Sequence, residues 1–516
     1  MTAAPQTAPL VPLRIDASEE FATLRELLTS ARYDEPTLAA RLGVRSLYNV
    51  KRVTDGREAL AGTPDDANAA LVRLLIDGER LAASLAERLL GVEALSALES
   101  LGVLEPASDD PTSLIATVML YPTQGIWLAS DRQPMRAADL DTIHQDYVFS
   151  ALSDLTERFL DVVPDAPGGR VLEMCAGTGI AALRAVRRGA AEAWAADITP
   201  RCVHFARFNA LLNGFGDRVR VVESDAWSTL EGETFDLVVA HPPYVPALSH
   251  RFDFRDGGAD GEQVARRIVG GLGAHLRPGG RFVMTAALSD RRGAPIAQRV
   301  REWLGAASDE FDLVVLENGE YGPMEAYQNI TKGGKDFVDC ERWLRHFDSL
   351  GVERFALSVV ELRRDAAGRA PVTERRPAGK SPDHRAVDWV FRWGRRAAAS
   401  GSTPEARLHG QRPRVAPGAR LAVHLESDAT GGWFTVGAAV ETAWPTHALV
   451  KAPPLAPTLL ELCDGTRDVV ALLQGLRDAG LVANEVSVAD VAHLVEVLAA
   501  AAALELPDCP IPPASA

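Results

Sequence analysis

The segment Val171-Leu-Glu-Met-Cys-Ala-Gly-Thr-Gly-Ile180 decides the fold of the middle of the chain. An apolar run typical of a buried strand leads directly into a turn with Gly177 and Gly179, and a helical stretch follows at once. Glycine is needed in such a turn because a ligand approaches the backbone closely and a side chain would block it. The spacing Gly177-x-Gly179-x-x-Ala182 alone also satisfies the dinucleotide-binding fingerprint, which is a weak signal.

Short strand-like runs alternate with helical stretches over residues 140–366. The runs cover residues 170–174, 192–197, 219–223, 235–240, 281–286, 311–316 and 355–362. Strands separated by helices predict parallel β-α-β units and a doubly wound sheet. We therefore expect an α/β domain with a Rossmann-like, seven-stranded sheet and a long insertion between its last two strands.

Chemistry-bearing residues stand at the ends of these predicted strands. Glu173 precedes the glycine turn, and the second strand ends at Asp197, where a carboxylate can accept hydrogen bonds from both hydroxyls of a ribose. The third strand is followed by Asp225-Ala-Trp227, and the fourth by His241-Pro-Pro-Tyr244. A dehydrogenase has no use for the Pro-Pro-Tyr step, so the spacing argues against a dinucleotide cofactor.

These motifs resemble those of the class I S-adenosylmethionine-dependent methyltransferases. Glu173-x-x-x-Gly177-x-Gly179 resembles their motif I, and His241-Pro-Pro-Tyr244 resembles motif IV of the amine-directed enzymes, Asn/Asp-Pro-Pro-Tyr/Phe. The segments 255–262 and 276–282 follow in the order found in the glutamine-amide and ribosomal-RNA-guanine enzymes of the "small" methyltransferase domain group. The resemblance covers residues 140–366 and implies S-adenosylmethionine as the cofactor.

The resemblance also implies two sets of site residues. The acceptor nitrogen would be held by His241, the backbone carbonyl of Pro242 and the ring of Tyr244, since two prolines fix the direction of that carbonyl. The aromatic segment before the glycine turn would cover the methionine end of the cofactor, with Tyr147 and Phe149 as candidates. The cofactor would be bound by Tyr147, Glu173, Ala176, Gly177, Gly179, Asp197, Ile198, Asp225, Ala226, Trp227 and His241.

Position 241 departs from the family pattern, because His stands where the family has Asn or Asp. A neutral imidazole offers a single acceptor atom but can take a proton. It suits an amine, an amide or an imidazole nitrogen that loses a proton as it is methylated. Three roles for His241 stay open: general base, positioning group, and mere contact with the cofactor.

The flanking regions predict two further domains. Residues 1–135 carry helices followed by short strands, which predicts a winged-helix-like domain, and its third helix, at 92–100, lacks the basic residues of a DNA reader. Asp131 and Arg132 are predicted in an exposed turn. Residues 367–417 are polar and rich in Pro and Arg, which predicts a linker containing one helix that packs Trp389 and Trp393 on a neighbouring domain.

Residues 418–507 predict a second winged-helix-like α+β domain. Its segment 459–472, with Asp464-Gly-Thr466, is similar to the small peptide-chaperone domains of ribosomal peptide modification systems. In those domains Gly465 would end one helix and Thr466 would cap the next. The resemblance implies that this domain presents a peptide substrate by strand addition.

Composition excludes several classes. The net charge of −16 disfavours a nucleic-acid partner, and no run of 18 apolar residues predicts a membrane span. Residues 1–12 lack a signal peptide, and five scattered cysteines without a Cys-x-x-Cys pair predict no metal site and a cytoplasmic location. We expect N-methylation of a peptide, a protein or a peptide-derived natural product; the alternatives are ribosomal-RNA base methylation and a catalytically silent scaffold.

Overall fold

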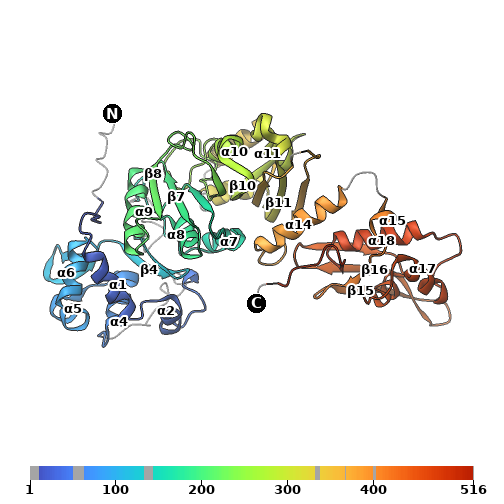
Figure 1. Ribbon diagram of the computed structural model, residues 1–516, viewed down its shortest axis with the longest axis horizontal. Helices are drawn as coiled ribbons and strands as arrows, with labels where there is room; N and C mark the ends of the chain where they lie inside the picture. The colour runs from blue at the N-terminus through green and yellow to red at the C-terminus, as the bar shows by residue number, and fades with distance from the viewer. Residues whose placement is uncertain are drawn as a thin grey trace.

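The computed structural model describes residues 11–49, 63–132, 143–331, 337–366, 368–398 and 403–514. Within these residues the chain forms three regions, which Figure 1 shows in blue, in green to yellow, and in orange to red. The central region carries the largest sheet, and the other two lie at opposite ends of it. The domain boundary predicted at residues 135–140 lies outside the described residues.

The central sheet has eight strands in the order β13-β11-β12-β10-β9-β6-β7-β8. Strands β6 to β10 pair in parallel, and β12 lies antiparallel between β10 and β11. The first four predicted strands coincide with β6 to β9, because continuous apolar runs mark strands that are buried on both faces. The strands are β6 (Arg170–Met174), β7 (Glu192–Asp197), β8 (Val219–Glu223), β9 (Phe235–Ala240), β10 (Leu276–Arg291), β11 (Asp312–Tyr321), β12 (Val352–Arg363) and β13 (Thr373–Pro377).

Helices cover both faces of this sheet. Val171 and Leu237 pack with residues of α8 and α9, whereas Leu172 and Val238 pack with residues of α10 and α11. Two further helices, α12 and α13, form the long insertion between β11 and β12. The helices are α7 (Asp154–Val162), α8 (Ile180–Arg187), α9 (Pro200–Leu212), α10 (Gln263–His275), α11 (Ile296–Leu304), the 3₁₀-helix η4 (Gly305–Glu310), α12 (Pro323–Thr331) and α13 (Phe337–Ser349).

The strand register brings three turns together at one edge of the sheet. Met174 at the end of β6 stands opposite Ala196 of β7 on one side and Ala240 of β9 on the other. The residues that follow these positions therefore leave the sheet side by side. This is the carboxyl edge at which open α/β sheets bind their ligands.

The prediction of seven strands is wrong by one, because β13 pairs in parallel with β11 at the edge of the sheet. Its sequence, Thr-Glu-Arg-Arg-Pro, shows no apolar alternation, so sequence reasoning assigned it to a linker. The strand is held by charges instead: Arg375 donates to Asp290 Oδ1 at 2.9 Å and to Glu317 Oε1 at 3.0 Å. Residues 367–417 are therefore not a linker throughout.

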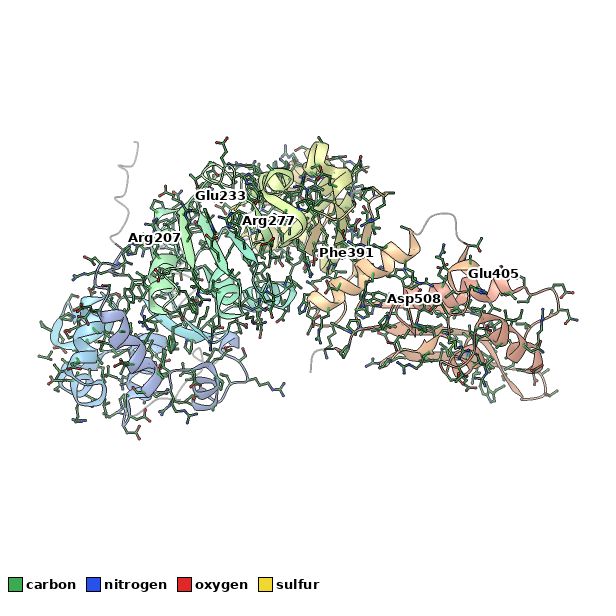
Figure 2. The ribbon with its side chains drawn as sticks, viewed as in Figure 1. Arg207, Glu233, Arg277, Phe391, Glu405 and Asp508 are labelled. Carbon is green, nitrogen blue, oxygen red and sulfur yellow. The ribbon has the colours of Figure 1, made fainter. Side chains whose placement is uncertain are left out.

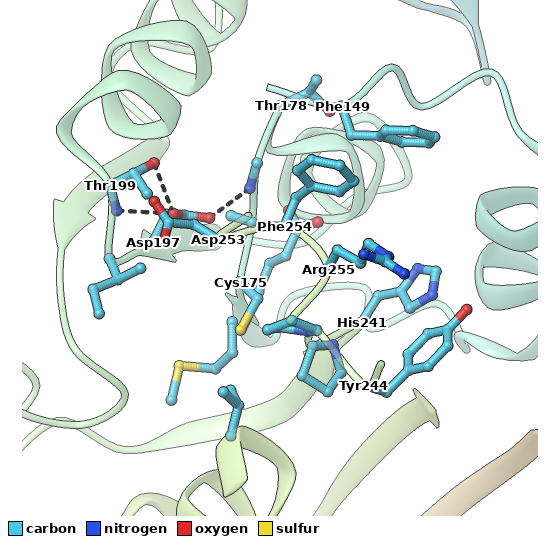
Figure 3. Close-up of a pocket in the computed structure, with 18 of the residues that line it drawn as sticks. Phe149, Cys175, Thr178, Asp197, Thr199, His241, Tyr244, Asp253, Phe254 and Arg255 are labelled. Carbon is cyan, nitrogen blue, oxygen red and sulfur yellow. Dashed lines mark hydrogen bonds between the residues drawn. The ribbon is translucent and has the colours of Figure 1, made fainter. Parts of the chain in front are cut away.

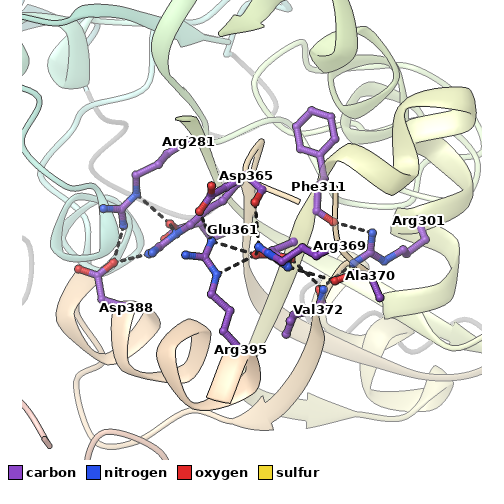
Figure 4. A network of polar contacts seen from close by, with 12 residues as sticks. Arg281, Arg301, Phe311, Glu361, Asp365, Arg369, Ala370, Val372, Asp388 and Arg395 are labelled. Carbon is purple, nitrogen blue, oxygen red and sulfur yellow. Dashed lines mark hydrogen bonds and ion pairs between the residues drawn. The ribbon is translucent and has the colours of Figure 1, made fainter. Parts of the chain in front are cut away.

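The rest of that stretch contains α14 (His384–Ala397), the short α15 (Pro404–Arg407) and β14 (Arg414–Val415). Trp389 and Trp393 of α14 are buried, as predicted, with ring centroids 6.0 Å apart. Ion pairs fix α14 to the sheet (Figure 4). Arg281 of β10 donates both to the buried Glu361 of β12, at 2.8 Å, and to Asp388 of α14, at 3.0 Å.

Contacts also join α14 to the C-terminal region. Arg396 of α14 pairs with Asp508 at 2.9 Å, and Arg392 donates to the carbonyl oxygen of Pro510. Figure 2 shows Phe391 and Asp508 at this junction. The helix therefore belongs structurally to both the central and the C-terminal regions.

The N-terminal region combines helices with a three-stranded sheet in the order β1-β3-β2 and a hairpin of β4 and β5. The helix–strand–helix–helix–strand–strand order over residues 67–116 is that of the predicted winged-helix-like domain, whose assignment stays a prediction. The elements are α1 (Glu20–Ser30), α2 (Glu35–Leu42), η1 (Leu47–Asn49), α4 (Ala67–Leu71), the π-helix η2 (Val72–Asp77), β1 (Leu81–Ala82), α5 (Ala83–Leu90), α6 (Val92–Ser100), β2 (Leu104–Ala107), β3 (Asp110–Ala116), β4 (Met119–Thr123) and β5 (Ile126–Ser130).

This region packs on α9 of the central region. Phe21 of α1 contacts Phe208 edge to face at 5.2 Å, and Asn209 exchanges hydrogen bonds with the backbone of Ala129. The exposed turn predicted at Asp131 and Arg132 is wrong. Asp131 is buried because it accepts two hydrogen bonds from the Arg201 guanidinium of α9, and Arg132 is held by the carbonyl oxygen of Leu74.

The C-terminal region places a three-stranded antiparallel sheet, in the order β15-β16-β17, before three helices. Gly465 lies in the left-handed conformation at φ +85°, but Asp468 rather than Thr466 caps the following helix, by accepting from Ala471 N. The elements are β15 (Arg420–Ser427), β16 (Trp433–Thr442), β17 (Ala448–Ala452), α16 (Ala456–Leu462), α17 (Val469–Asp478), α18 (Val488–Ala500) and β18 (Leu504–Glu505), which pairs with β14.

Candidate active site

A cavity of about 470 Å³ opens at the carboxyl edge of β6, β7, β8 and β9 (Figure 3). Its volume lies within the range of about 300–1,000 Å³ that is usual for small-molecule sites. Most of the predicted site residues line it: Tyr147, Glu173, Ala176, Gly177, Asp197, Ile198, Asp225, Ala226, His241, Pro242 and Tyr244. Gly179 and Trp227 do not.

The two glycines of the turn have different roles. Gly177 has φ +52°, and a Cβ atom there would meet no atom within 4 Å, so the space beside it is open to a ligand. A Cβ atom on Gly179, at φ +78°, would instead come within 3.3 Å of Ala206 Cβ on α9. Gly179 therefore permits close packing of two helices and does not contact the cavity.

Glu173 is a buried carboxylate near the end of β6, and it is hydrogen-bonded to the backbone at the start of α8. Its Oε2 atom accepts a hydrogen bond from Ala182 N at 2.9 Å, at the start of α8. Burial raises the pKa of Glu173 to about 8, and the negative charge of Asp197 adds to this rise. A ligand ammonium group would stabilise the charged form.

Asp197 ties the ends of β6 and β7 together. Its Oδ2 atom accepts from Gly177 N at 2.9 Å, and its Oδ1 atom accepts from Thr199 N at 3.0 Å. The Thr199 hydroxyl also donates to Oδ1, at 3.2 Å. A carboxylate offers about four acceptor sites, so Asp197 keeps capacity for one ligand hydroxyl after these three bonds. Burial raises the pKa of Asp197, which a hydroxyl donor would counteract.

The turn after β8 forms the next part of the wall. Ala226 takes the left-handed conformation at φ +51°, which brings a small apolar side chain to the cavity, and Ile198 on the opposite side is 54% exposed. Asp225 pairs with Arg267 at 2.8 Å. Trp227, predicted to bind the cofactor, points away: its ring stacks on His275 at 4.3 Å and its Nε1 donates to Ile268 O, because α10 offers it a packing surface.

The acceptor motif follows β9. The His241 ring lies between Phe159 of α7, with centroids 5.3 Å apart, and Tyr244, with centroids 6.0 Å apart and planes 16° from parallel. This partial burial lowers the pKa of His241 to about 4, well below the ordinary 6.5. The imidazole is therefore neutral at physiological pH, and its two ring nitrogens offer a ligand one hydrogen-bond acceptor and one donor.

The loop that follows the acceptor motif packs closely against it, and this close packing requires the glycines of the segment 255–262. A Cβ atom on Gly257 would lie 2.7 Å from Pro243 O, and one on Gly261 would lie 2.6 Å from Tyr244 O. Only glycine allows these backbones to approach the acceptor motif so closely. Glu262, buried at the end of this loop, accepts from Ser289 N at 2.7 Å and pairs with Arg299, which anchors the loop to β10 and α11.

An aromatic cluster lies beside the glycine loop. Phe149 stacks on Phe254 at 5.5 Å (Figure 3). Tyr147 contacts Phe254 at 5.7 Å. Sequence reasoning proposed Tyr147 and Phe149 but missed Phe254 and Phe159. No motif marks these two residues, because each is an ordinary aromatic position whose role depends on the fold.

The cavity fits S-adenosylmethionine. It offers open space at Gly177, buried carboxylates at Glu173 and Asp197 for an ammonium group and a ribose, and apolar contacts at Ile198 and Ala226. All five cysteines are free, and the described part of the chain holds no cluster of three or more His, Cys, Asp or Glu residues fit for a metal ion. Over the same residues, no helix combines the length and apolarity that a membrane crossing needs.

Comparison with known proteins gives the class of this region. Residues 140–305 match the family model described as methyltransferase small domain. The predicted resemblance to the class I S-adenosylmethionine-dependent methyltransferases is thereby confirmed for the central region, as is S-adenosylmethionine as its cofactor. The alternative of a dinucleotide cofactor is not supported.

Three relatives show which proteins this region is similar to. A release factor glutamine methyltransferase of Gloeobacter violaceus is 26% identical over 178 residues, which cover 29% of this chain and 62% of that protein. A putative protein N5-glutamine methyltransferase of Methanocaldococcus jannaschii is 32% identical over 123 residues, 22% of this chain and 60% of that protein. A ribosomal RNA large subunit methyltransferase K/L of Pseudomonas putida is 25% identical over 198 residues, 38% of this chain and 24% of that protein. The chain thus spans less than two thirds of each.

Proposed function

We propose that the whole chain transfers the methyl group of S-adenosylmethionine to a nitrogen atom of a peptide or protein. The observation that carries the proposal is the His241 imidazole, which lies in the same cavity as the residues suited to the cofactor. When bound, S-adenosylmethionine supplies a methyl group on a sulfonium, which is already a good leaving group. The protein then has to orient the acceptor and exclude water.

We assign His241 the role of a positioning residue. To hold a full proton at pH 7, an imidazole with a pKa of about 4 would need about 4 kcal/mol, at 1.36 kcal/mol for each pH unit. An effective general base has a pKa near the working pH, so His241 is better suited to accept a hydrogen bond from the acceptor N–H. The proton leaves to water after transfer.

Other residues complete the acceptor site. The backbone carbonyl of Pro242 accepts a hydrogen bond from a second N–H of the acceptor, since the Pro242-Pro243 pair restricts the direction of this carbonyl. The Tyr244 ring, nearly parallel to the imidazole, offers a face for a flat amide. The cluster of Tyr147, Phe149 and Phe254 keeps water from the reacting atoms.

The C-terminal region supports a peptide rather than a free small molecule as substrate. Its resemblance to peptide-chaperone domains implies docking of an extended segment, and the edge strand β15 is exposed along its whole length. Two of the relatives are named for the methylation of glutamine in a release factor or a protein, which agrees with this class of substrate. The cytoplasmic location stays a prediction.

Ribosomal-RNA base methylation is the second candidate, favoured by the relative named as a ribosomal RNA methyltransferase. The net charge of −16 disfavours it, since nucleic-acid binding relies on clustered cations. The silent-scaffold alternative is disfavoured because the cavity keeps Glu173, Gly177 and Asp197 in place.

Methyl transfer from labelled S-adenosylmethionine to a cell extract tests the proposal. We expect label in material that protease removes and ribonuclease leaves, on a nitrogen located by mass spectrometry, with the His241→Ala variant as the negative control. Label that only ribonuclease removes would support the RNA alternative instead. Absence of cofactor binding in calorimetry would support the scaffold.

A further inference from the structure

A second, smaller cavity of about 250 Å³ lies next to the acceptor motif. It shares the walls formed by Tyr244, Val245 and Arg255 with the larger cavity. The two cavities are therefore neighbours across Tyr244, which we assign to the acceptor site, and across Val245 and Arg255. A peptide residue adjacent to one held at Tyr244 would lie near this second cavity.

The far wall of the second cavity comes from the insertion between β11 and β12. Ala326 and Ile330 project from α12, and Tyr321 and Phe355 stack at 5.5 Å at the ends of β11 and β12. The remaining lining residues are Pro246, Ala287, Asn329 and Leu357. The insertion thus builds a pocket that the strands alone would leave open.

The walls are mainly apolar and carry no free charge. The Arg255 guanidinium donates to Ile330 O at 2.7 Å and lies 3.7 Å from the buried Asp256 carboxylate, so its charge is balanced within the protein. Burial raises the pKa of Tyr321 to about 12, so its phenol is neutral. A charged side group would lose its hydration here without gaining a partner.

We propose that this second cavity binds an uncharged, mainly apolar side chain of the peptide acceptor, next to the residue that is methylated. This inference rests on the proposed function, and it specifies which side chain the site selects beside the methylated residue of the peptide. The volume is below the range of about 300–1,000 Å³ typical of whole small-molecule sites, which matches one side chain. The β11–β12 insertion is then a specificity element.

Binding of short amide probes tests this inference in the presence of S-adenosylhomocysteine. N-acetylphenylalanine amide should bind the wild type with a Kd on the order of 1 mM, and N-acetylaspartate amide at least tenfold more weakly. The Ala326→Trp variant fills the cavity and should abolish binding of the phenylalanine probe. If Ala326→Trp does not fold, Asn329→Trp replaces it in the test. This variant adds bulk to the same wall from an exposed position and should weaken binding of the phenylalanine probe.

The matched control is Gln328→Trp, which adds the same side chain at an exposed position of α12 outside the cavity and should bind the probe like the wild type. Binding of S-adenosylhomocysteine is measured in the same titrations.

The outcomes separate the inference from the proposed function. If S-adenosylhomocysteine binds but the phenylalanine probe does not, or if the cavity variants bind the probe normally, the inference is wrong while the proposed function stands. If S-adenosylhomocysteine itself fails to bind, the proposed function fails. A nucleoside monophosphate that binds and is blocked by Ala326→Trp would also overturn the inference, in favour of RNA.

Discussion

Glu173 should couple cofactor binding to the release of a proton. Its carboxyl group has a pKa of about 8 in the free protein, so it is mostly protonated at pH 7. An ammonium group of the cofactor favours the ionised form, and between pH 5 and 7 an α-amino group stays protonated. Ionising Glu173 costs about 1.4 kcal/mol for each pH unit below 8, so affinity for S-adenosylmethionine should rise about tenfold per pH unit in this range.

Calorimetry in two buffers of different ionisation enthalpy measures the released proton directly. At pH 7 we expect about 0.9 proton per cofactor bound, the fraction of Glu173 that is protonated at a pKa of about 8. Glu173→Gln should bind the cofactor more weakly and lose most of the proton release. Any proton release that remains would come from Asp197, whose pKa is also raised. Glu87→Gln, at an exposed position of α5, is the matched control. Wild-type affinity that is constant from pH 5 to 7 would refute this coupling.

The same group affects the stability of the cofactor-free protein. Its folded-state pKa lies above the unfolded value of about 4.3, so Glu173 favours the fold below that pH, and the contribution is lost as pH rises through 8. Glu173→Gln stays neutral throughout. Its thermal midpoint relative to the wild type should therefore rise between pH 5 and 9, as measured by differential scanning fluorimetry.

Three further changes test the remaining site. Asp197→Ala should weaken S-adenosylmethionine binding by about 2–3 kcal/mol in calorimetry, because charge-assisted hydrogen bonds are lost; unchanged affinity would remove Asp197 from the site. His241→Ala should keep cofactor affinity but lose on the order of 10²-fold in turnover, whereas His241→Asn should keep much of the turnover. The wild-type rate should decline near pH 4 rather than 6.5, and a decline at 6.5 would contradict the neutral imidazole. Gly177→Ala should weaken cofactor binding more than it lowers stability, while Gly43→Ala, which has a similar φ of +65° and is equally uncrowded, should change stability alone.

The sequence predicted the parallel strands and the residues at their ends well, since buried runs and motif spacing are local signals. It failed where a role depends on the tertiary neighbour. Gly179 serves packing against Ala206, and Trp227 finds His275, although both belong to motifs that pointed to the cofactor. Asp131 is buried where Val148 N and Arg201, 70 positions later in the chain, donate hydrogen bonds to it.

The eighth strand was missed for a different physical reason. Apolar alternation reveals a strand that buries one face in a core, whereas β13 is held by ion pairs of Arg375 with Asp290 and Glu317. Charged residues are equally common in loops, so composition favours a linker. Phe159 and Phe254 likewise carry no local signal, because an aromatic residue beside a ligand has the same pattern as one in a core.

The attachment of α14 sets a length scale for the substrate. Ion pairs join this helix to the central sheet and to the C-terminal region, so the separation between the exposed β15 edge and the acceptor cavity depends on how α14 connects the two regions. A peptide held at that edge would have to span this separation, and extended chain covers at most about 3.3–3.6 Å per residue. Peptides with too few residues between the docking segment and the methylated residue could not be modified, so docking at β15 would set a minimum length for this spacer in the substrate.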